Sequence, residues 1–293
     1  MAITRRAFLR TGLAGGIGVT AAGAYGFIYE RHRITVTRAT LSVIDLPAAL
    51  DGVRIGILTD LHHSALVLQQ DVLDAAQLLM SERPDLIALL GDYVTWADRR
   101  YVGSCAEALA TLSAPHGVFA ILGNHDEEHA TAHALVARGF EVLIDDRTDV
   151  RVRGESVGIA GIRFWTKKPS EIHRVLVGAP RAAILLAHDP RRLTEAANLG
   201  VPLQLSGHTH GGQITLPLIG APAARKYPVA AGATRLQNTT LFVSRGVGTV
   251  FVPVRLNCPP EAALITLRAE DRGDYRPAGR RSSSDRLRTN GLD

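Results

Sequence analysis

The sequence predicts an α/β fold, a four-layer α/β/β/α sandwich in which two facing mixed β-sheets are covered by helices. Three patterns support this prediction. Short apolar runs end in polar blocks, as buried strands of such sheets do. Helical segments separate the first of these runs, and several short strands follow one another in the middle of the chain.

The first half of the chain alternates strands and helices. Residue alternation over Ile34–Val43 predicts an edge strand. Three buried strands are expected next, at Arg54–Thr59, Leu86–Leu90 and Val118–Leu122. A helical pattern follows each strand, and these helices are predicted over Gln69–Glu82, Tyr101–Ser113 and Glu127–Arg138.

The second half supplies the other sheet. Short strands are predicted between Phe140 and Ile162, and a helix near Ser170–Val177. Buried strands are then expected at Ala183–Leu186 and Pro202–Ser206. The Pro- and Gly-rich segment Thr215–Thr239 is predicted to form a loop and a hairpin on the side of the site.

Polar blocks follow directly on five of the buried strands. In such sheets the sites lie outside the carboxyl ends of the strands. The blocks therefore bring Asp, Asn and His side chains to one place, and this is the inventory of a metal site. Seven side chains are candidate ligands, namely Asp60, His62, Asp92, Asn124, His188, His208 and His210.

The number of ligands predicts two metals, because a single zinc ion takes only three or four protein ligands. One carboxylate can bridge two cations, and Asp92 is central among the strands. Two cations about 3.5–4 Å apart clamp a phosphoryl group and make hydroxide from bound water. Imidazole and carboxylate ligands suit Zn, Mn, Fe or Ni, so the metal stays open. We assign Asp60, His62, Asp92 and His210 to one metal, and Asp92, Asn124, His188 and His208 to the other.

A simpler explanation exists for each residue taken alone. Asp and Asn at strand ends also cap the helices that follow. A single His at such a place is often a hydrogen-bonded core residue. Capping does not explain why several His side chains accompany the Asp and Asn residues. The metal interpretation is therefore favoured for the set as a whole.

Short motifs occur in a fixed order along the chain, from Asp60-Leu61-His62 and Gly91-Asp92 through Gly123-Asn124-His125-Asp126 to Gly207-His208-Thr209-His210. This order resembles the calcineurin-like metallophosphoesterases over roughly Ile34 to Leu267. The segment from Ser206 to Gln213 is similar to their bacterial twin-arginine-exported phosphodiesterase branch. The resemblance implies the metallophosphoesterase fold and hydrolysis of a phosphodiester by metal-bound hydroxide.

The resemblance also implies that His125 is catalytic and assists the leaving oxygen or stabilises the phosphoryl group. Protein-phosphatase members orient this His with an Asp three residues after the metal-binding Asp, and Thr95 stands at that position here. How His125 is oriented is left open by the sequence. Arg245, bracketed by glycine at the end of a strand, is the candidate substrate-binding residue, and a surface role is the equal alternative.

The amino terminus predicts export. Residues 1–29 are interpreted as a twin-arginine signal peptide, with Arg5 and Arg6 ahead of an uncharged stretch over Thr11–Tyr29. Cleavage is predicted after Ala24. The alternative is a retained anchor through residues 11–29. We expect a periplasmic or extracytoplasmic protein that uses the twin-arginine translocase, with membrane association as the alternative.

Composition limits the other classes of function. The net charge of +5 falls to +2 without Arg5, Arg6 and Arg10, and no basic stripe with aromatic residues indicates nucleic acid. Two cysteines form no disulfide framework. One domain over residues 34–268 and a monomer are expected, and residues 269–293 are predicted to be a disordered tail.

The sequence thus predicts a phosphodiesterase with two divalent metal ions that acts outside the cytoplasm. The expected substrate is a small phosphodiester or a lipid or nucleotide-sugar phosphate. Two alternatives are kept. One is a UDP-2,3-diacylglucosamine-type pyrophosphohydrolase at the membrane, which requires an apolar groove beside the metals. The other is a non-catalytic metal-binding envelope protein.

Overall fold

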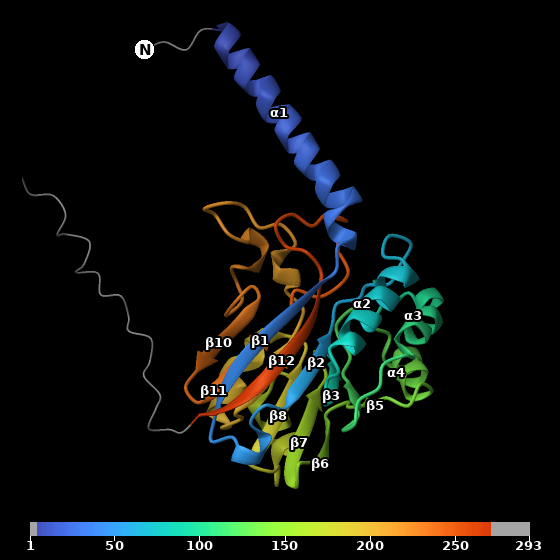
Figure 1. Ribbon diagram of the computed structural model, residues 1–293, viewed down its shortest axis with the longest axis vertical. Helices are drawn as coiled ribbons and strands as arrows, with labels where there is room; N and C mark the ends of the chain where they lie inside the picture. Colours follow the sequence, from blue (N-terminus) through green and yellow to red (C-terminus); the bar gives the residue numbers. More distant parts are fainter. Residues whose placement is uncertain (1–4, 271–293) are drawn as a thin grey trace, which may run out of the picture.

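The computed structural model describes residues 5–270 and places two six-stranded sheets face to face (Figure 1). The first sheet has the order β1 (Thr35–Ile44), β12 (Glu261–Glu270), β2 (Arg54–Leu58), β3 (Leu86–Leu89), β4 (Val118–Ala120) and β5 (Glu141–Val142). The second has the order β10 (Gly232–Leu236), β11 (Thr239–Val243), β9 (Leu203–Ser206), β8 (Ala182–Ala187), β7 (Glu155–Ile162) and β6 (Asp146–Val152).

Both sheets are mixed. Strands β2 to β5 run parallel, and β12 pairs antiparallel with β2 and parallel with the edge strand β1. In the second sheet β7, β8, β9 and β11 run parallel, while the edge strands β6 and β10 are antiparallel to their neighbours. The prediction of two facing mixed sheets, with an edge strand from residue 34 or 35, is confirmed.

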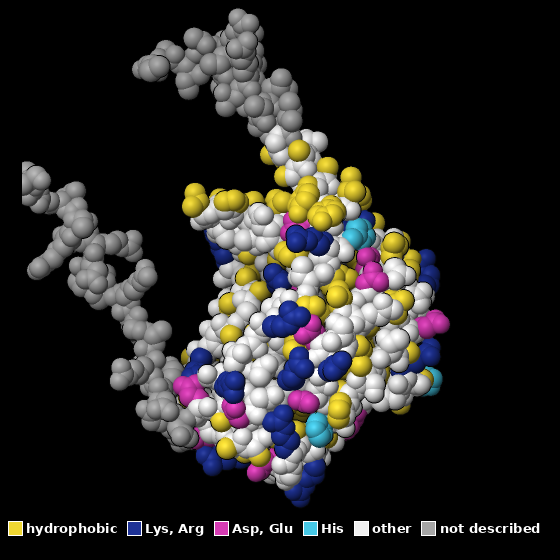
Figure 2. Space-filling view, viewed as in Figure 1, with side chains coloured by type: hydrophobic (Ala, Val, Ile, Leu, Met, Phe, Trp, Pro, Cys, Tyr) yellow, Lys and Arg dark blue, Asp and Glu magenta, His cyan; other side chains and the backbone are white. Residues whose placement is uncertain are grey.

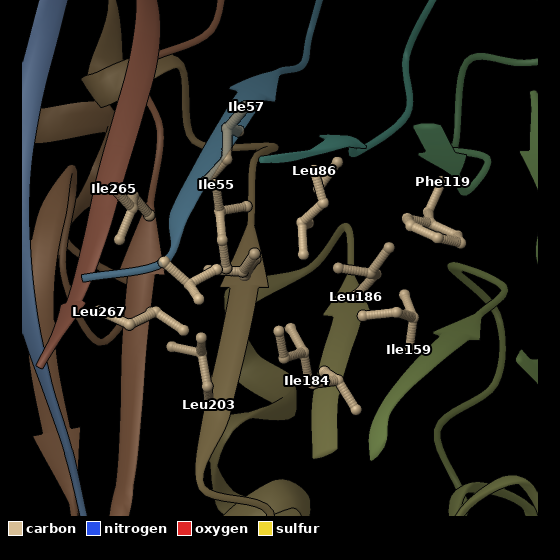
Figure 3. Close-up of a cluster of buried hydrophobic side chains, with 14 of the residues drawn as sticks. Ile55, Ile57, Leu86, Phe119, Ile159, Ile184, Leu186, Leu203, Ile265 and Leu267 are labelled. Carbon is tan, nitrogen blue, oxygen red and sulfur yellow. The ribbon is translucent and has the colours of Figure 1, made fainter. Parts of the chain in front are cut away.

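The main core lies between the sheets (Figure 3). Ile55, Leu86 and Phe119 come from the first sheet and face Ile184 and Leu203 of the second. Each is at most 4% exposed. Burial of such a side chain contributes about 1.5–3 kcal/mol. This core holds the two sets of strand ends in register with each other.

Helices cover the outer faces. Helices α2 (Gln69–Ser81), α3 (Val102–Leu109) and α4 (Glu128–Val136) pack on the first sheet, and α5 (Pro169–Leu176) and α6 (Leu193–Asn198) on the second. The sequence predicted all of them except α6. Six short 3₁₀ helices complete the described part, η1 (Glu30–His32), η2 (Ala48–Leu50), η3 (Arg99–Tyr101), η4 (Pro190–Arg192), η5 (His210–Gly212) and η6 (Pro222–Ala224).

Helix α1 (Arg5–Ile28) projects from the end of the molecule where the loops after the strands lie (Figure 1). Its last turn is attached to the domain. The carbonyl of Gly26 accepts from the N–H of Arg255 at 3.3 Å, and Oε1 of the buried Glu30 accepts from the N–H of Cys258 at 2.7 Å. Among the described helices, none has the length and apolar character that crossing a membrane requires.

The predicted signal segment and the predicted tail both overlap regular secondary structure. The predicted cleavage point after Ala24 falls inside α1. At the other end, Ala269 and Glu270 continue β12, and the rest of the predicted tail lies outside the described residues. Cys105 and Cys258 are both buried and free.

Candidate metal centre

The candidate ligands follow β2, β3, β4, β8 and β9 at one edge of the paired sheets. The backbone there is unusual. Asp60, His62, Asp92, His208 and His210 all have positive φ, between 49° and 71°. Such conformations cost non-glycine residues free energy and cluster at functional sites. The surrounding fold therefore holds these side chains in place against a local conformational cost.

The first group joins Asp60, His62 and His210, whose ligand atoms lie within 4.8 Å of one another. The Nε2 atoms of His62 and His210 are 3.1 Å apart, and Nε2 of His210 is 3.3 Å from Oδ1 of Asp60. Two imidazole nitrogens and a carboxylate oxygen that converge in this way form a site of the kind that zinc or a similar cation takes.

The second group joins Asp92, His188 and His208 within the same limit. Oδ2 of Asp92 is 3.2 Å from Nε2 of His188 and 3.5 Å from Nε2 of His62, which belongs to the first group. The Asp92 carboxylate therefore lies between the groups, as a bridging ligand must. The two groups fit a dinuclear metal centre.

Asn124 supplies a test of whether a cation fits. Its Oδ1 atom is buried and has no hydrogen-bond partner among the described residues. Leaving such an atom unpaired costs about 1–3 kcal/mol. The Asn124 loop is tied to the centre, because the N–H of His125 donates to Oδ1 of Asp92 at 2.8 Å. An unpaired buried acceptor beside this set of ligand atoms is what a metal site shows.

Neighbouring groups orient the ligands. Nδ1 of His188 donates to the carbonyl of Leu90 at 2.6 Å, which turns Nε2 toward Asp92. The Asp60 carboxylate accepts from the N–H of His208 at 2.9 Å and from Oγ1 of Thr59 at 2.9 Å. The first and second sheets are thus linked directly through ligands of both groups.

Asp126 connects the two loops that follow β3 and β4. Its buried carboxylate accepts from the N–H groups of Asp92, Tyr93 and Gly123, each at 2.8 Å. Burial and the nearby Asp92 raise the pKa of Asp126 to about 7. The Asp126 carboxylate, which directly follows His125 in the sequence, therefore bonds to backbone N–H groups.

Burial also decides the charge of the ligands. It lowers the pKa values of His62 and His208 to about 3 and the pKa of His210 well below its ordinary value. Burial and Asp92 raise the pKa of Asp60 to about 6. Burial would lower the pKa of His188, but Asp92 and Asp60 outweigh it and raise that pKa to about 10. Neutral imidazoles are the form that binds metal, and a cation would take the place of the His188 proton.

His125 is oriented by the backbone. Its Nδ1 accepts from the N–H of Trp96 at 3.3 Å, so the neutral ring carries its proton on Nε2. Thr95 instead approaches Nδ1 of His62, with Oγ1 at 3.3 Å, and Asp98 binds Arg100. The ring of His125 lies 4.9 Å from that of His62, and burial lowers its pKa. The orienting acid absent from the sequence is replaced by a main-chain donor.

Arg245 lies just after β11, and its guanidinium binds side chains of β1 and β12. It donates to Oε2 of the buried Glu261 at 2.8–3.0 Å and to Oγ1 of Thr37 at 2.9 Å. The structure brings the seven candidate ligands and His125 to one edge, but it pairs Arg245 with β1 and β12. Its contact with phosphate stays a prediction.

Sequence reasoning missed Arg255, which is fully buried. It donates to the carbonyls of Gly248, Arg245 and Cys258 at 2.6–3.2 Å and so fixes the loop after β11. A Cβ atom at Gly246 would collide with Asp60, so this loop packs directly on a ligand. No motif distinguishes Arg255 from a surface arginine, because its role depends on carbonyls that only the folded loop brings together.

Known proteins share these features. Residues 53–212 match the model of the family described as calcineurin-like phosphoesterase. The chain is 30% identical to the metallophosphoesterase YkuE of Bacillus subtilis, over 91% of this chain and 98% of that protein. It is also 30% identical to the phosphodiesterase YaeI of Escherichia coli, over 90% and 99%. A metallophosphoesterase of Aquifex aeolicus is 29% identical over 85% and 97%.

Proposed function

Because the chain belongs to the calcineurin-like phosphoesterases, a family of metal-dependent phosphoester hydrolases, we propose that it is a phosphodiesterase that acts outside the cytoplasm. The observation that supports a catalytic site best is the position of His125 beside two groups of metal ligands that share Asp92. A protein that only stores metal has no need of a non-ligating imidazole that presents an N–H there.

Asp60, His62, Asp92 and His210 would hold one cation, and Asp92, Asn124, His188 and His208 the other. Bound divalent ions of this kind polarise a phosphoryl group and lower the pKa of water. The Nε2–H of His125, opposite the nitrogen that accepts from the Trp96 N–H, would donate a hydrogen bond to the leaving oxygen as negative charge develops on it. A hydrogen-bond donor aimed at developing charge contributes about 10²–10³-fold.

Two cavities support a diester rather than a monoester substrate. One of about 470 Å³ is lined by His208, His210, Tyr227 and Phe251. Another of about 580 Å³ is lined by Thr95, Trp96 and Phe251, next to His125. A phosphodiester carries two substituents, and each cavity accepts one. The 30% identity to a protein named phosphodiesterase supports the same choice.

The proposed location rests on the amino terminus. Arg5 and Arg6 precede a stretch without charged residues over Thr11–Tyr29, which is the pattern that the twin-arginine translocase reads. Replacing both by lysine (Arg5→Lys, Arg6→Lys) should leave the precursor inside the cell, with the folded enzyme still active in the lysate. Mature-length protein outside the cytoplasm in this double variant would contradict export by this route.

One observation favours a second candidate, the pyrophosphohydrolase of a diacylated nucleotide sugar. The cavity beside His208 and His210 is lined by Ile214, Leu216 and Val252, so it offers the apolar groove that this substrate requires. Its weakness is topological, because such a substrate is cytoplasmic while the amino terminus predicts export.

The test is hydrolysis by the purified chain reconstituted with zinc, manganese, iron or nickel. The panel contains bis-p-nitrophenyl phosphate, p-nitrophenyl phosphate and a nucleotide-sugar pyrophosphate. We expect the diester to have the highest kcat/KM. A preference for the monoester, or no turnover with any metal, would contradict the proposal, and a preference for the pyrophosphate would support the second candidate.

A further inference from the structure

Large exposed apolar side chains gather at the end of the molecule from which α1 emerges (Figure 2). Leu218 is fully exposed, and Phe251 and Trp96 are 80% and 65% exposed. They lie on separate loops. We call this group the apolar rim, and it comprises Leu66, Trp96, Leu218, Ile219, Phe251 and Val252.

The apolar rim surrounds the entrance to the metal centre. The rings of Trp96 and Phe251 are 5.4 Å apart. Leu66, Trp96 and Phe251 line the cavity next to Thr95, and Phe251 and Val252 line the one that contains His208 and His210. The short helix η1, which follows α1, adjoins the rim, because its Arg31 donates to the carbonyl of Leu66 at 3.1 Å. Substrate therefore reaches the ligands past exposed apolar side chains.

The loop that carries Leu218 and Ile219 has charge of one sign. Residues 196–260 contain neither Asp nor Glu, and Arg225 and Lys226 are exposed in the loop that also carries Leu218. Basic side chains beside exposed apolar ones complement a surface that is apolar inside and anionic at its boundary. That is the chemistry of a bilayer with anionic headgroups.

A lipid layer suits this geometry better than a protein partner does. A protein seated on the rim would cover both cavities and close the access of substrate to the ligands. Lipid headgroups instead carry phosphodiesters and would present them to the same opening. The uncharged stretch over Thr11–Tyr29 also leaves the molecule at this end.

We propose that the apolar rim docks on an anionic lipid surface and that the substrates are phosphodiesters held at that surface. The proposal rests on the phosphodiesterase function proposed above. Leu218 and Ile219 enter the apolar layer, and Arg225 and Lys226 lie at the headgroups. Docking then places the two cavities that share Phe251 against the lipid phosphates.

Binding to vesicles tests the surface. The full chain is floated with vesicles of phosphatidylcholine alone or with 30% phosphatidylglycerol, an amount of the order used for anionic membranes. We expect tighter binding to the anionic vesicles and about a tenfold loss for the double variant Leu218→Ser, Ile219→Ser. The matched control replaces exposed Val136 and Val177, on α4 and after α5, by serine. Equal losses in both double variants, or none, would overturn the proposal.

Tryptophan emission shows which end of the molecule touches lipid, since the chain has only two tryptophans. Trp165→Phe leaves Trp96 as the only emitter, and brominated phosphatidylcholine in the vesicles should quench it. Vesicle binding without quenching of Trp96 would mean attachment through another part and would contradict the proposal.

Activity on a soluble diester distinguishes the docking proposal from the phosphodiesterase function on which it rests. The Leu218→Ser, Ile219→Ser variant should hydrolyse bis-p-nitrophenyl phosphate as fast as the unaltered chain, because neither residue contacts the ligands. An unaltered chain that binds vesicles but hydrolyses no diester would refute the proposed function and leave docking supported. Full diesterase activity without vesicle binding would refute docking alone.

Discussion

The buried metal ligands, which we call the floor, and the apolar rim differ in burial and in how firmly their side chains are held. On the floor, Asp60, His62 and His188 are at most 1% exposed and have fixed partners. On the rim, Phe251 and Trp96 are exposed and line the cavities. The metal ligands are therefore held in place before substrate binds, whereas exposed loop residues contact the substituents of the substrate. Substitutions on the floor should change the rate for every substrate, and those of Trp96 and Phe251, which line the cavities, should discriminate between substrates.

The largest effect is expected for Asp92→Asn. It removes the charge of the carboxylate that lies between the groups, with Oδ2 of Asp92 3.2 Å from Nε2 of His188 and 3.5 Å from Nε2 of His62, whereas Oδ1 of Asp60 is 4.0 Å from Nε2 of His188. Loss of metal assistance worth several kcal/mol lowers kcat by about 10³-fold or more. Steady-state rates on bis-p-nitrophenyl phosphate measure this. Asp98→Asn is the control, because Asp98 lies six residues on and, among the described residues, its side chain bonds only to Arg100. A similar loss of kcat in both variants would mean that the substitutions act by destabilising the loop, not by removing a bridging ligand.

The next effect is that of His125→Ala, which should keep both metals and lower kcat with little change in KM. A p-nitrophenolate needs little protonation and an alkoxide needs much. Alkyl diesters should therefore lose about 10–100-fold more activity than aryl diesters. Equal losses would indicate that His125 stabilises the phosphoryl oxygens. A missing metal would show that His125 is a ligand.

A smaller and selective effect is expected on the rim. Phe251→Ala removes an aromatic wall shared by both cavities. We expect kcat/KM for bis-p-nitrophenyl phosphate to fall about threefold to tenfold. Methyl p-nitrophenyl phosphate, with one small substituent, should change less. If both substrates lost activity equally, Phe251 would be acting on the floor through its loop, and the contrast between floor and rim would fail.

The smallest effect on activity is expected for Arg245→Met. The change leaves the buried Glu261 without its cation, which should lower the free energy of unfolding by about 1–3 kcal/mol. KM should stay nearly constant, since the guanidinium binds Glu261 and Thr37. Urea unfolding and a KM determination measure the two quantities. A KM raised several-fold at unchanged stability would instead support the phosphate contact predicted from sequence.

The floor could be predicted from sequence far better than the rim. Buried strands such as Arg54–Leu58 have a strong local signal in the sequence. The residues that follow such strands lie at the carboxyl edge of the sheet, so their position follows from that of the strand. The position of β12 between β1 and β2 could not be read, because pairing across more than two hundred residues leaves no local pattern. The Trp96 N–H that orients His125 is a main-chain group, and side-chain motifs do not encode it.

The central claim is that this centre holds two cations joined by Asp92. The most direct measurement is the metal content per chain, by inductively coupled plasma mass spectrometry after reconstitution and desalting. The account predicts two equivalents for the unaltered chain and fewer than two for Asp92→Asn. One equivalent in the unaltered chain, or two retained by Asp92→Asn, would contradict it.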